Sequence, residues 1–362
     1  MSARPVGFSG LDEAEFLRDY WQRRPLLIKG ALQEFEDPLE AGVLAALAME
    51  DGVDARIVET TDQGWEFRAG PFDEGAFDSE HPWTLLVQEV DYYLDEVAAL
   101  REKVAFLPNW RFDDVMVSYA SDGAGVGPHY DNYDVFLLQG SGQREWKLGQ
   151  QCGPDEAMIE HPRLRVLAEF RESTSYTLEA GDVLYVPPRL AHWGISRGDS
   201  LCYSLGFRAP RVNDMVSQWV DEALEQLDPE VLYQDPPLNP ARPGEITAAA
   251  LSAARSQLLE ALDKLDSEGR WFGEMLTQDG NLAEPFEIRA GASVRLDASA
   301  RLSWAQGKAG LLVYANGTTL TATETQQNAL QALCTGRPVV VGTELDLELA
   351  ERISQLGCLR DD

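Results

Sequence analysis

Two histidines and one aspartate stand in two short motifs of the chain. His129 and Asp131 fall in segment 125–136, Gly-Val-Gly-Pro-His-Tyr-Asp-Asn-Tyr-Asp-Val-Phe, and His192 follows segment 181–188, Gly-Asp-Val-Leu-Tyr-Val-Pro-Pro. The chain has only four histidines, so finding two of them in these motifs is a selective pattern. Two imidazoles and one carboxylate are the ligand set of a non-haem Fe(II) oxygenase. The pattern therefore predicts a metal site at these three residues.

The predicted strands explain how the two motifs could meet. Residues i and i+2 of a strand point to one face, so a strand over 129–138 would project the histidine and the aspartate of the first motif together. The prolines at 187 and 188 end a strand over 183–186, and the loop that they form would deliver His192. Two alternatives stay open: ordinary buried histidines, or a catalytic zinc on the same ligands, although no HExxH helix supports zinc.

An iron of this kind needs an electron source to activate O2, and the usual one is 2-oxoglutarate. The far carboxylate of 2-oxoglutarate needs a cation, for which Arg144 at the start of a predicted strand over 144–148 is the candidate. The planar fork of arginine can bind both carboxylate oxygens. Lys147 is the competing choice, but Arg144 shares a strand face with Trp146 and points inward if that ring does. Pairing with the His129 strand would place Arg144 beside the metal; a surface arginine is the alternative.

Four segments of the chain carry a resemblance to a known family. They are Trp21–Gly30, Asp113–Tyr119, Gly125–Phe136 and Tyr203–Pro210. Over residues 90–210 the chain resembles the JmjC-type 2-oxoglutarate oxygenases. More narrowly, and over essentially its whole length, it is similar to the bacterial ribosomal oxygenases, which hydroxylate an arginine of 50S ribosomal protein sixteen.

This resemblance implies Fe(II) at His129, Asp131 and His192, with O2 as one co-substrate. It also implies 2-oxoglutarate at Arg144, with a hydroxyl contact from Ser118. Many relatives that act on histones hold the co-substrate with a lysine, so an arginine at this position favours the ribosomal branch. The expected activity is hydroxylation of an arginine side chain in a basic ribosomal protein.

The composition is that of an acidic chain without a membrane segment. Its 362 residues include 61 acidic and 30 basic side chains, for a net charge of −31. Such a surface repels nucleic-acid phosphates and attracts a basic partner, although simple solubility or adaptation to salt would explain the same charge. No signal-peptide core, membrane-length apolar stretch or CxxC pair is found in the sequence. We expect a cytoplasmic protein that binds neither membranes nor nucleic acid directly.

The catalytic domain is expected over residues 1–210. Helices are predicted over 12–22, 41–49 and 87–101, followed by strands that Gly-rich turns separate. This order is typical of a mostly β double-stranded β-helix, the jelly-roll barrel of JmjC and cupin-like proteins.

Two smaller domains are expected after the barrel. Apolar residues recur at helical spacing over 215–227 and 246–265, within a segment spanning 211–275. The resemblance implies a helical dimerisation module there, and hence a homodimer; an intramolecular buttress is the alternative. For residues 276–362 it implies a winged-helix-like α+β domain, with a helix over 324–334. That segment has 11 acidic and 7 basic residues, which favours a protein-interaction or structural role over DNA binding.

An arginine substrate would need acidic groups or aromatic faces at the mouth of the barrel. Asp122 and Asp134 are the acidic candidates, and Tyr119 and Tyr133 could stack on a guanidinium. Asp134 could instead orient a ligand histidine, and Asp122 could be an ordinary turn residue. Two other functions remain open: hydroxylation of a histidine in another ribosomal protein, and a non-catalytic cupin-like binding protein.

Overall fold

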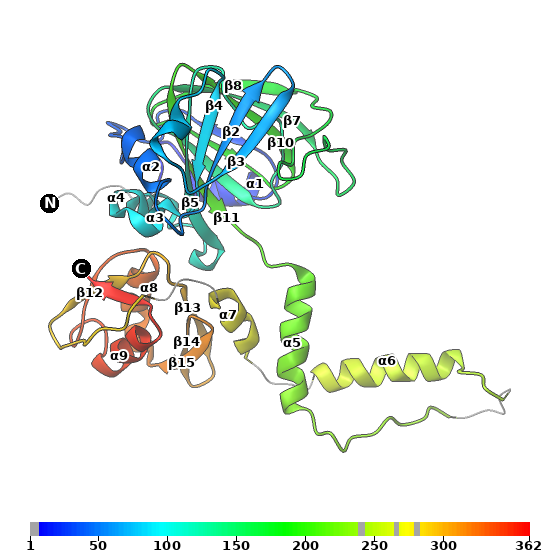
Figure 1. The fold of residues 1–362 in the computed structure, drawn as a ribbon. Helices are drawn as coiled ribbons and strands as arrows, with labels where there is room; N and C mark the ends of the chain where they lie inside the picture. The colour runs from blue at the N-terminus through cyan, green and yellow to red at the C-terminus, as the bar shows by residue number, and fades with distance from the viewer. Residues whose placement is uncertain (1–6, 238–242, 264–267, 279–282) are drawn as a thin grey trace. The chain divides into compact units, whose positions relative to one another are not determined.

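The computed structural model describes residues 7–237, 243–263, 268–278 and 283–362. The chain divides into two units. Figure 1 labels the helices and strands along the ribbon. The first unit is Met1–Ala209 with Arg295–Ser299 and Ala332–Pro338, and the rest of the chain forms the second. None of the helices in the described ranges is long and apolar enough to cross a membrane.

Two sheets in the first unit face each other and enclose a barrel (Figure 1). The larger sheet has eight strands in the order β1-β9-β6-β11-β5-β4-β2-β3, and the smaller has the order β10-β7-β8. The strands are β1 (Leu26–Ile28), β2 (Ala55–Thr61), β3 (Gly64–Ala69), β4 (Trp83–Val87), β5 (Phe112–Ala120), β6 (Asp134–Gln139), β7 (Gln143–Gln151), β8 (Thr174–Glu179), β9 (Val183–Val186), β10 (Leu190–Arg197) and β11 (Ser200–Phe207). This architecture is the predicted double-stranded β-helix.

The strands at the centre of the larger sheet are covered on both faces. Every residue of β6, β9 and β11 is buried, which explains their continuous apolar sequences. The outer face packs against the N-terminal helices, where Phe16 meets Tyr185 with 4.9 Å between ring centroids. These helices are α1 (Glu13–Asp19), α2 (Ala41–Leu47), α3 (Val90–Tyr93) and α4 (Asp95–Ala98). The inner face is left to line the barrel.

Three local predictions differ from the structure. The helix predicted over 87–101 is broken into α3, α4 and a 3-10 turn, because Leu94 between them has an extended backbone (φ −129°, ψ 115°). The strand predicted over 129–138 begins only at Asp134. The third difference is strand pairing: β7 pairs with β10 and β8, whereas the expected partner was the strand of the first histidine.

The helices and two small sheets that follow residue 210 lie mainly in the second unit, and α8 and β12 are each divided between the two units. The helices are α5 (Val212–Gln226), α6 (Ala248–Asp263), α7 (Arg270–Thr277), α8 (Gln327–Cys334) and α9 (Leu347–Gln355). Six strands form two sheets, ordered β16-β12-β17 and β13-β14-β15. The strands are β12 (Ser293–Leu296), β13 (Leu302–Gly307), β14 (Gly310–Ala315), β15 (Thr318–Ala322), β16 (Val339–Val340) and β17 (Leu359–Asp361). The predicted helices over 215–227 and 324–334 are confirmed in type. The last two residues of the helix predicted over 246–265 lie outside the described residues.

Candidate active site

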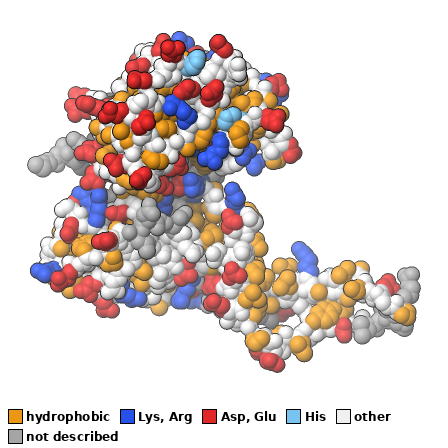
Figure 2. Space-filling model, in the orientation of Figure 1, with side chains coloured by type: hydrophobic (Ala, Val, Ile, Leu, Met, Phe, Trp, Pro, Cys, Tyr) orange, Lys and Arg blue, Asp and Glu red, His pale blue; other side chains and the backbone are white. Residues whose placement is uncertain are grey.

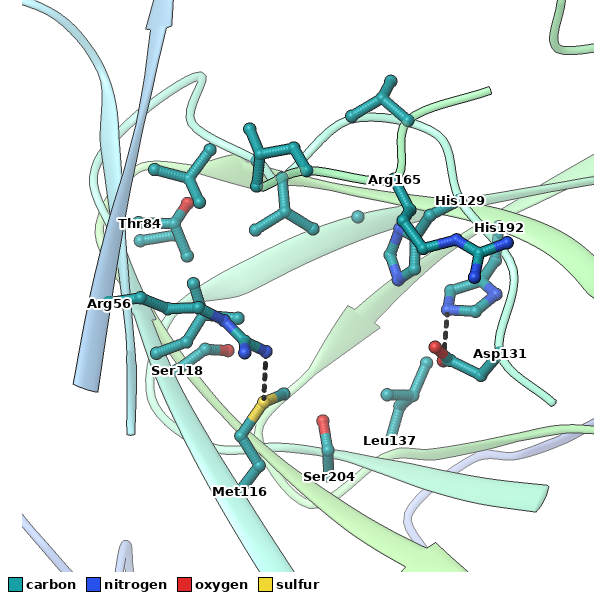
Figure 3. A pocket seen from close by; sticks show the side chains of 18 of the residues that line it. Arg56, Thr84, Met116, Ser118, His129, Asp131, Leu137, Arg165, His192 and Ser204 are labelled. Carbon is teal, nitrogen blue, oxygen red and sulfur yellow. Dashed lines mark hydrogen bonds and ion pairs between the residues drawn. The ribbon is translucent and has the colours of Figure 1, made fainter. Parts of the chain in front are cut away.

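The three predicted metal ligands lie together at one end of the barrel. One nitrogen from each of His129 and His192 and one carboxylate oxygen of Asp131 all lie within 4.8 Å of one another. His192 Nε2 is 3.5 Å from Asp131 Oδ2, and Figure 3 shows both imidazoles and the carboxylate directed toward one point. Two nitrogens and one carboxylate oxygen that converge in this way fit a metal of the iron type.

A short backbone ladder brings the two motifs together. The His129 N–H donates to the His192 carbonyl at 3.0 Å, and the His192 N–H donates back at 2.8 Å. The Arg189 N–H donates to the Asp131 carbonyl at 2.6 Å, which ties the turn after Pro187-Pro188 to the first motif. His192 lies on β10, the strand that follows the turn at these two prolines, as predicted. His129 and Asp131 project together from an irregular segment, held by this bridge rather than by a long strand.

Both imidazoles are oriented by backbone carbonyls. His129 Nδ1 lies 3.0 Å from the Gly127 carbonyl, and His192 Nδ1 lies 2.9 Å from the Leu190 carbonyl. An Nδ1–H that donates to a carbonyl leaves the lone pair on Nε2, which is the atom that can bind a metal. Two features require glycine at position 127. The φ of Gly127 is +81°, and a Cβ there would lie 2.9 Å from atoms of Trp65 and Val166.

The electrostatics of the three residues suit metal binding. Burial and the neighbouring His192 lower the pKa of His129 to about 4, so its imidazole is neutral at pH 7. Burial alone would raise the pKa of the Asp131 carboxyl, but a hydrogen bond from His192 and the charges of both imidazoles together hold it below its usual value. The site therefore presents a neutral nitrogen of His129 and an anionic oxygen of Asp131, the protonation states that a metal requires of these two ligands.

Arg144 is buried near the triad without a carboxylate partner among the described residues. Its side chain is 5% exposed and donates to Ser118 Oγ at 2.9 Å and to Ser200 Oγ at 3.1 and 3.2 Å. Burial lowers the pKa of its guanidinium, although arginine remains charged in proteins. A buried cation held only by hydroxyls and a carbonyl requires an anion. A carboxylate of a small ligand fits this requirement.

One cavity of about 330 Å³ contains the triad and Arg144. Arg144 and Trp146 both line it, in agreement with strand parity, whereas Lys147 is paired with Glu172 at 3.2 Å and is not part of the lining. On the larger sheet, Arg56, Leu86 and Ser118 lie in one register row across β2, β4 and β5 and so share the inner face. The cavity thus combines a metal face, a cation and a hydroxyl.

The structure separates the four predicted substrate residues. Tyr133 lines the cavity. Asp122 is exposed and accepts the Gly198 N–H at 2.7 Å, as a turn residue does. Tyr119 has the opposite strand parity to Ser118 and packs against Trp83.

Asp134 lies in a buried hydrogen-bond network outside the cavity lining. It is fully buried, pairs with Arg111 at 3.0 Å and accepts from the Tyr185 hydroxyl at 2.6 Å and from Gln22 at 3.2 Å. These partners are neither metal ligands nor cavity residues, so Asp134 neither orients a ligand histidine nor faces a substrate. Like Asp122 and Tyr119, it lies outside the described lining of the cavity.

Several residues in or next to the cavity escaped the sequence reasoning. Ser200 supports Arg144 and shares a 2.6 Å hydrogen bond with Ser196, although nothing near it in sequence marks a site. Three further arginines line the cavity: Arg56, Arg163 and Arg165. Arg56 alternates with Ala55 and Ile57, which pack in the hydrophobic core, so the sequence pattern alone would place Arg56 on a solvated face. The other two lie in an irregular segment, where no periodicity exists.

A jelly-roll barrel with a His-x-Asp and a distant histidine at one end defines a JmjC-type metal-dependent oxygenase. Consistent with this class, the JmjC domain family model matches residues 99–215. The ribosomal protein uL16 3-hydroxylase of Escherichia coli (strain K12) is 37% identical over 269 residues, which is 74% of this chain and 72% of that protein.

Solved structures give the same result. A crystal structure of E. coli ycfD superposes with a TM-score of 0.85 at 30% identity, covering 98% of this chain and 100% of that chain. A second structure, of YcfD as a ribosomal oxygenase in complex with cobalt and 2-oxoglutarate, has a TM-score of 0.79 at 31% identity and covers 97% and 96% of the two chains. The chain belongs to the family of JmjC-domain ribosomal oxygenases.

Proposed function

We propose that the protein is an Fe(II)- and 2-oxoglutarate-dependent hydroxylase of a ribosomal protein, and that its target is an arginine of 50S ribosomal protein sixteen (uL16). The observation that supports this most directly is the presence, in one cavity, of a triad of two histidines and one aspartate and of a buried guanidinium without a carboxylate partner among the described residues. The uL16 3-hydroxylase activity of the E. coli relative supports the choice of target.

Two groups of cavity residues divide the chemistry. His129, Asp131 and His192 would hold Fe(II), and Arg144 with Ser118 would bind the far carboxylate of 2-oxoglutarate. When bound, iron and 2-oxoglutarate together use O2 to convert a substrate C–H into C–OH, with release of succinate and CO2. Apolar walls that include Leu86 and Leu137 exclude bulk water around these groups.

Tyr133 is the retained candidate for contact with the substrate side chain. It lines the cavity next to Asp131, and burial together with the Asp131 charge raises the pKa of its hydroxyl, so the phenol is neutral at pH 7. A neutral aromatic face can stack on a guanidinium. At longer range, the net charge of −31 would attract a basic ribosomal protein.

A homodimer formed through residues 211–275 is part of the proposal. Val212, Val216, Val220 and Leu224 repeat every four residues along α5 and are 37–74% exposed. The helix α6 has no buried residue, and its Leu251, Leu258 and Leu259 are 43–61% exposed. Figure 2 shows the hydrophobic side chains that gather over this region. Apolar stripes of this extent indicate a protein partner, and a second copy offers a matching stripe.

The domain division and the cellular setting complete the proposal. We divide the chain into a catalytic domain (1–210), a dimerisation module (211–275) and a winged-helix-like domain (276–362). The acidic balance of the last domain supports a protein-interaction or structural role rather than nucleic-acid binding. A cytoplasmic location would give the enzyme access to ribosomal proteins.

The test is 2-oxoglutarate turnover by purified protein with Fe(II) and ascorbate, with and without a uL16 peptide. We expect peptide-stimulated succinate and a mass increase of one oxygen atom on an arginine of the peptide. Oxygen addition to a histidine of another ribosomal protein, with no reaction on uL16, would replace the proposed target. Failure to form succinate with any substrate would instead favour a non-catalytic binding protein.

A further inference from the structure

The cavity has a charge opposite to that of the chain as a whole. Four arginines line it, Arg56, Arg144, Arg163 and Arg165, whereas Asp131 is the single carboxylate of its described lining. Elsewhere the chain is dominated by acidic groups, with 61 acidic and 30 basic side chains in total. Arg144 is accounted for by the proposed co-substrate, and the other three arginines remain to be explained.

Arg56 reaches into the cavity from the larger sheet. It shares the register row of Ser118, and its Nη2 lies 3.8 Å from Met116 Sδ (Figure 3). No carboxylate of the described residues forms an ion pair with it. A thioether is only a weak acceptor, so this guanidinium retains its capacity to attract an anion.

Arg163 and Arg165 belong to the segment between β7 and β8 and are both exposed to solvent. The Arg163 guanidinium lies 5.3 Å from the ring centroid of Phe67, another cavity residue. Arg165 lines the same cavity as both metal-ligand histidines and is drawn with them in Figure 3. As with Arg56, no described carboxylate is paired with either.

The segment that contains these two arginines is held in place by the metal-binding loop. His161 Nδ1 accepts the N–H groups of Arg163 and Leu164 at 3.1 and 2.8 Å. The Leu167 N–H donates to the carbonyl of Pro128, the residue before His129, at 2.7 Å. The arginines are therefore fixed near the metal face rather than placed at random along a surface loop.

We propose that Arg163, Arg165 and Arg56 form a cationic access path that draws 2-oxoglutarate from solvent to Arg144. 2-Oxoglutarate is a dianion, and a protein of net charge −31 repels it at long range. Cations at the mouth of a cavity with apolar walls focus the local field and raise the association rate. This inference rests on the proposed function, because it takes 2-oxoglutarate as the ligand of Arg144.

The test measures 2-oxoglutarate association with Co(II)-loaded protein, which reports binding without turnover. Trp146 provides the signal, since its ring lies 6.0 Å from the Arg144 guanidinium and 5.9 Å from the His192 ring. Stopped-flow tryptophan fluorescence would compare wild type with Arg163→Gln/Arg165→Gln and with Arg56→Gln across salt concentrations. We expect about tenfold slower association for the double variant at low salt, and convergence with wild type at high salt.

Two controls separate charge from structure. Arg163→Lys/Arg165→Lys keeps both charges and should keep the wild-type rate. Arg171→Gln removes a charge from the same exposed segment but outside the cavity lining, and should leave the rate unchanged.

The outcomes distinguish this proposal from the function on which it rests. Wild-type binding of 2-oxoglutarate with unchanged rates in the glutamine variants would overturn the access path and leave the proposed function intact. Unchanged rates combined with weaker peptide binding would assign the arginines to an acidic part of the substrate instead. An absence of 2-oxoglutarate binding by wild-type protein would overturn both.

Discussion

The interior of the barrel and the surface of helices α5 and α6 are opposites in chemistry. In the barrel, polar side chains such as Arg144 and His192 are 5% and 2% exposed. On the helices, Leu224 and Leu258 are 64% and 58% exposed. Buried charge and exposed apolar surface each carry a free-energy cost in an isolated chain.

The difference shows what each region lacks. The barrel residues need small ligands, a metal and a carboxylate, that satisfy the buried polar groups. The helices expose apolar side chains, and we propose that a second copy of the chain covers them. Buried polar side chains without partners thus point to ligands, and exposed apolar side chains point to the proposed assembly.

The largest effect is expected from removal of a metal ligand, because the barrel interior would then lose the metal that its buried polar groups require. Asp131→Ala leaves two imidazoles, which cannot hold Fe(II) in the facial geometry, so we expect loss of metal binding and of turnover. Co(II) titration and succinate formation measure the two effects. His81→Ala is the matched control, because His81 is exposed and outside the cavity lining. Full activity in the Asp131 variant would contradict the metal assignment.

Replacement of Arg144 should have the next largest effect. Arg144→Met keeps most of the length of the side chain but removes the cation, and the hydrogen bonds lost to a charged carboxylate correspond to about 100-fold weaker 2-oxoglutarate binding. Calorimetry on the Co(II)-loaded protein measures this directly. Arg197→Met, at an exposed arginine paired with Glu145 at 2.7 Å, is the control. Equal affinities for the Arg144 variant and wild type would show that the guanidinium serves another anion.

The sequence alone predicted the site residues whose positions depend on local patterns. The His-x-Asp spacing, the prolines after β9 and the shared parity of Arg144 and Trp146 predicted which side chains meet in the barrel. Strand pairing was not predictable in the same way, because the partner of β7 depends on how the whole barrel closes. Ser200, which supports Arg144, became visible only once β11 was placed beside β5.

The residues that face the substrate were harder to predict from the sequence, for a related reason. Asp134 follows the metal motif closely in sequence, yet β6 begins at that residue and turns its carboxylate into the network with Arg111 and Tyr185. Side-chain direction at the start of a strand depends on the preceding irregular segment, which periodicity does not describe. The same limit applies to Arg163 and Arg165, whose segment has no regular structure.

Charged substitutions on the apolar stripe of α5 test the proposed role of the exposed helices without changing the barrel. Val220→Glu/Leu224→Glu places two carboxylates on the proposed contact face, and we expect about tenfold or greater weakening of the dimer, since buried unpaired charge is costly. Sedimentation velocity over a range of concentrations measures the assembly, and 2-oxoglutarate binding should be unchanged. Val43→Glu, at an exposed apolar residue of α2, is the control. A double variant that associates as wild type does would exclude this face.

The smallest expected effect concerns a buried carboxyl outside the lining of the cavity that holds the metal ligands. Asp91 is 1% exposed; its Oδ1 accepts the Val115 N–H at 2.8 Å, and its Oδ2 has no hydrogen-bond partner. Burial raises its pKa to about 6, above the value of about 4 for an unfolded chain. The folded state therefore binds the proton more tightly, and this group destabilises the fold progressively as pH rises from about 4 to about 6, by at most about 3 kcal/mol.

Asp91→Asn keeps the acceptor for Val115 and cannot ionise. Its Tm relative to wild type should therefore increase between pH 4 and pH 7, with 2-oxoglutarate binding unchanged. Scanning calorimetry at several pH values measures the first, and calorimetric titration measures the second. Parallel pH profiles for the two proteins would contradict the assigned pKa. A loss of 2-oxoglutarate binding would show that Asp91, like Arg144, is buried for the sake of a ligand.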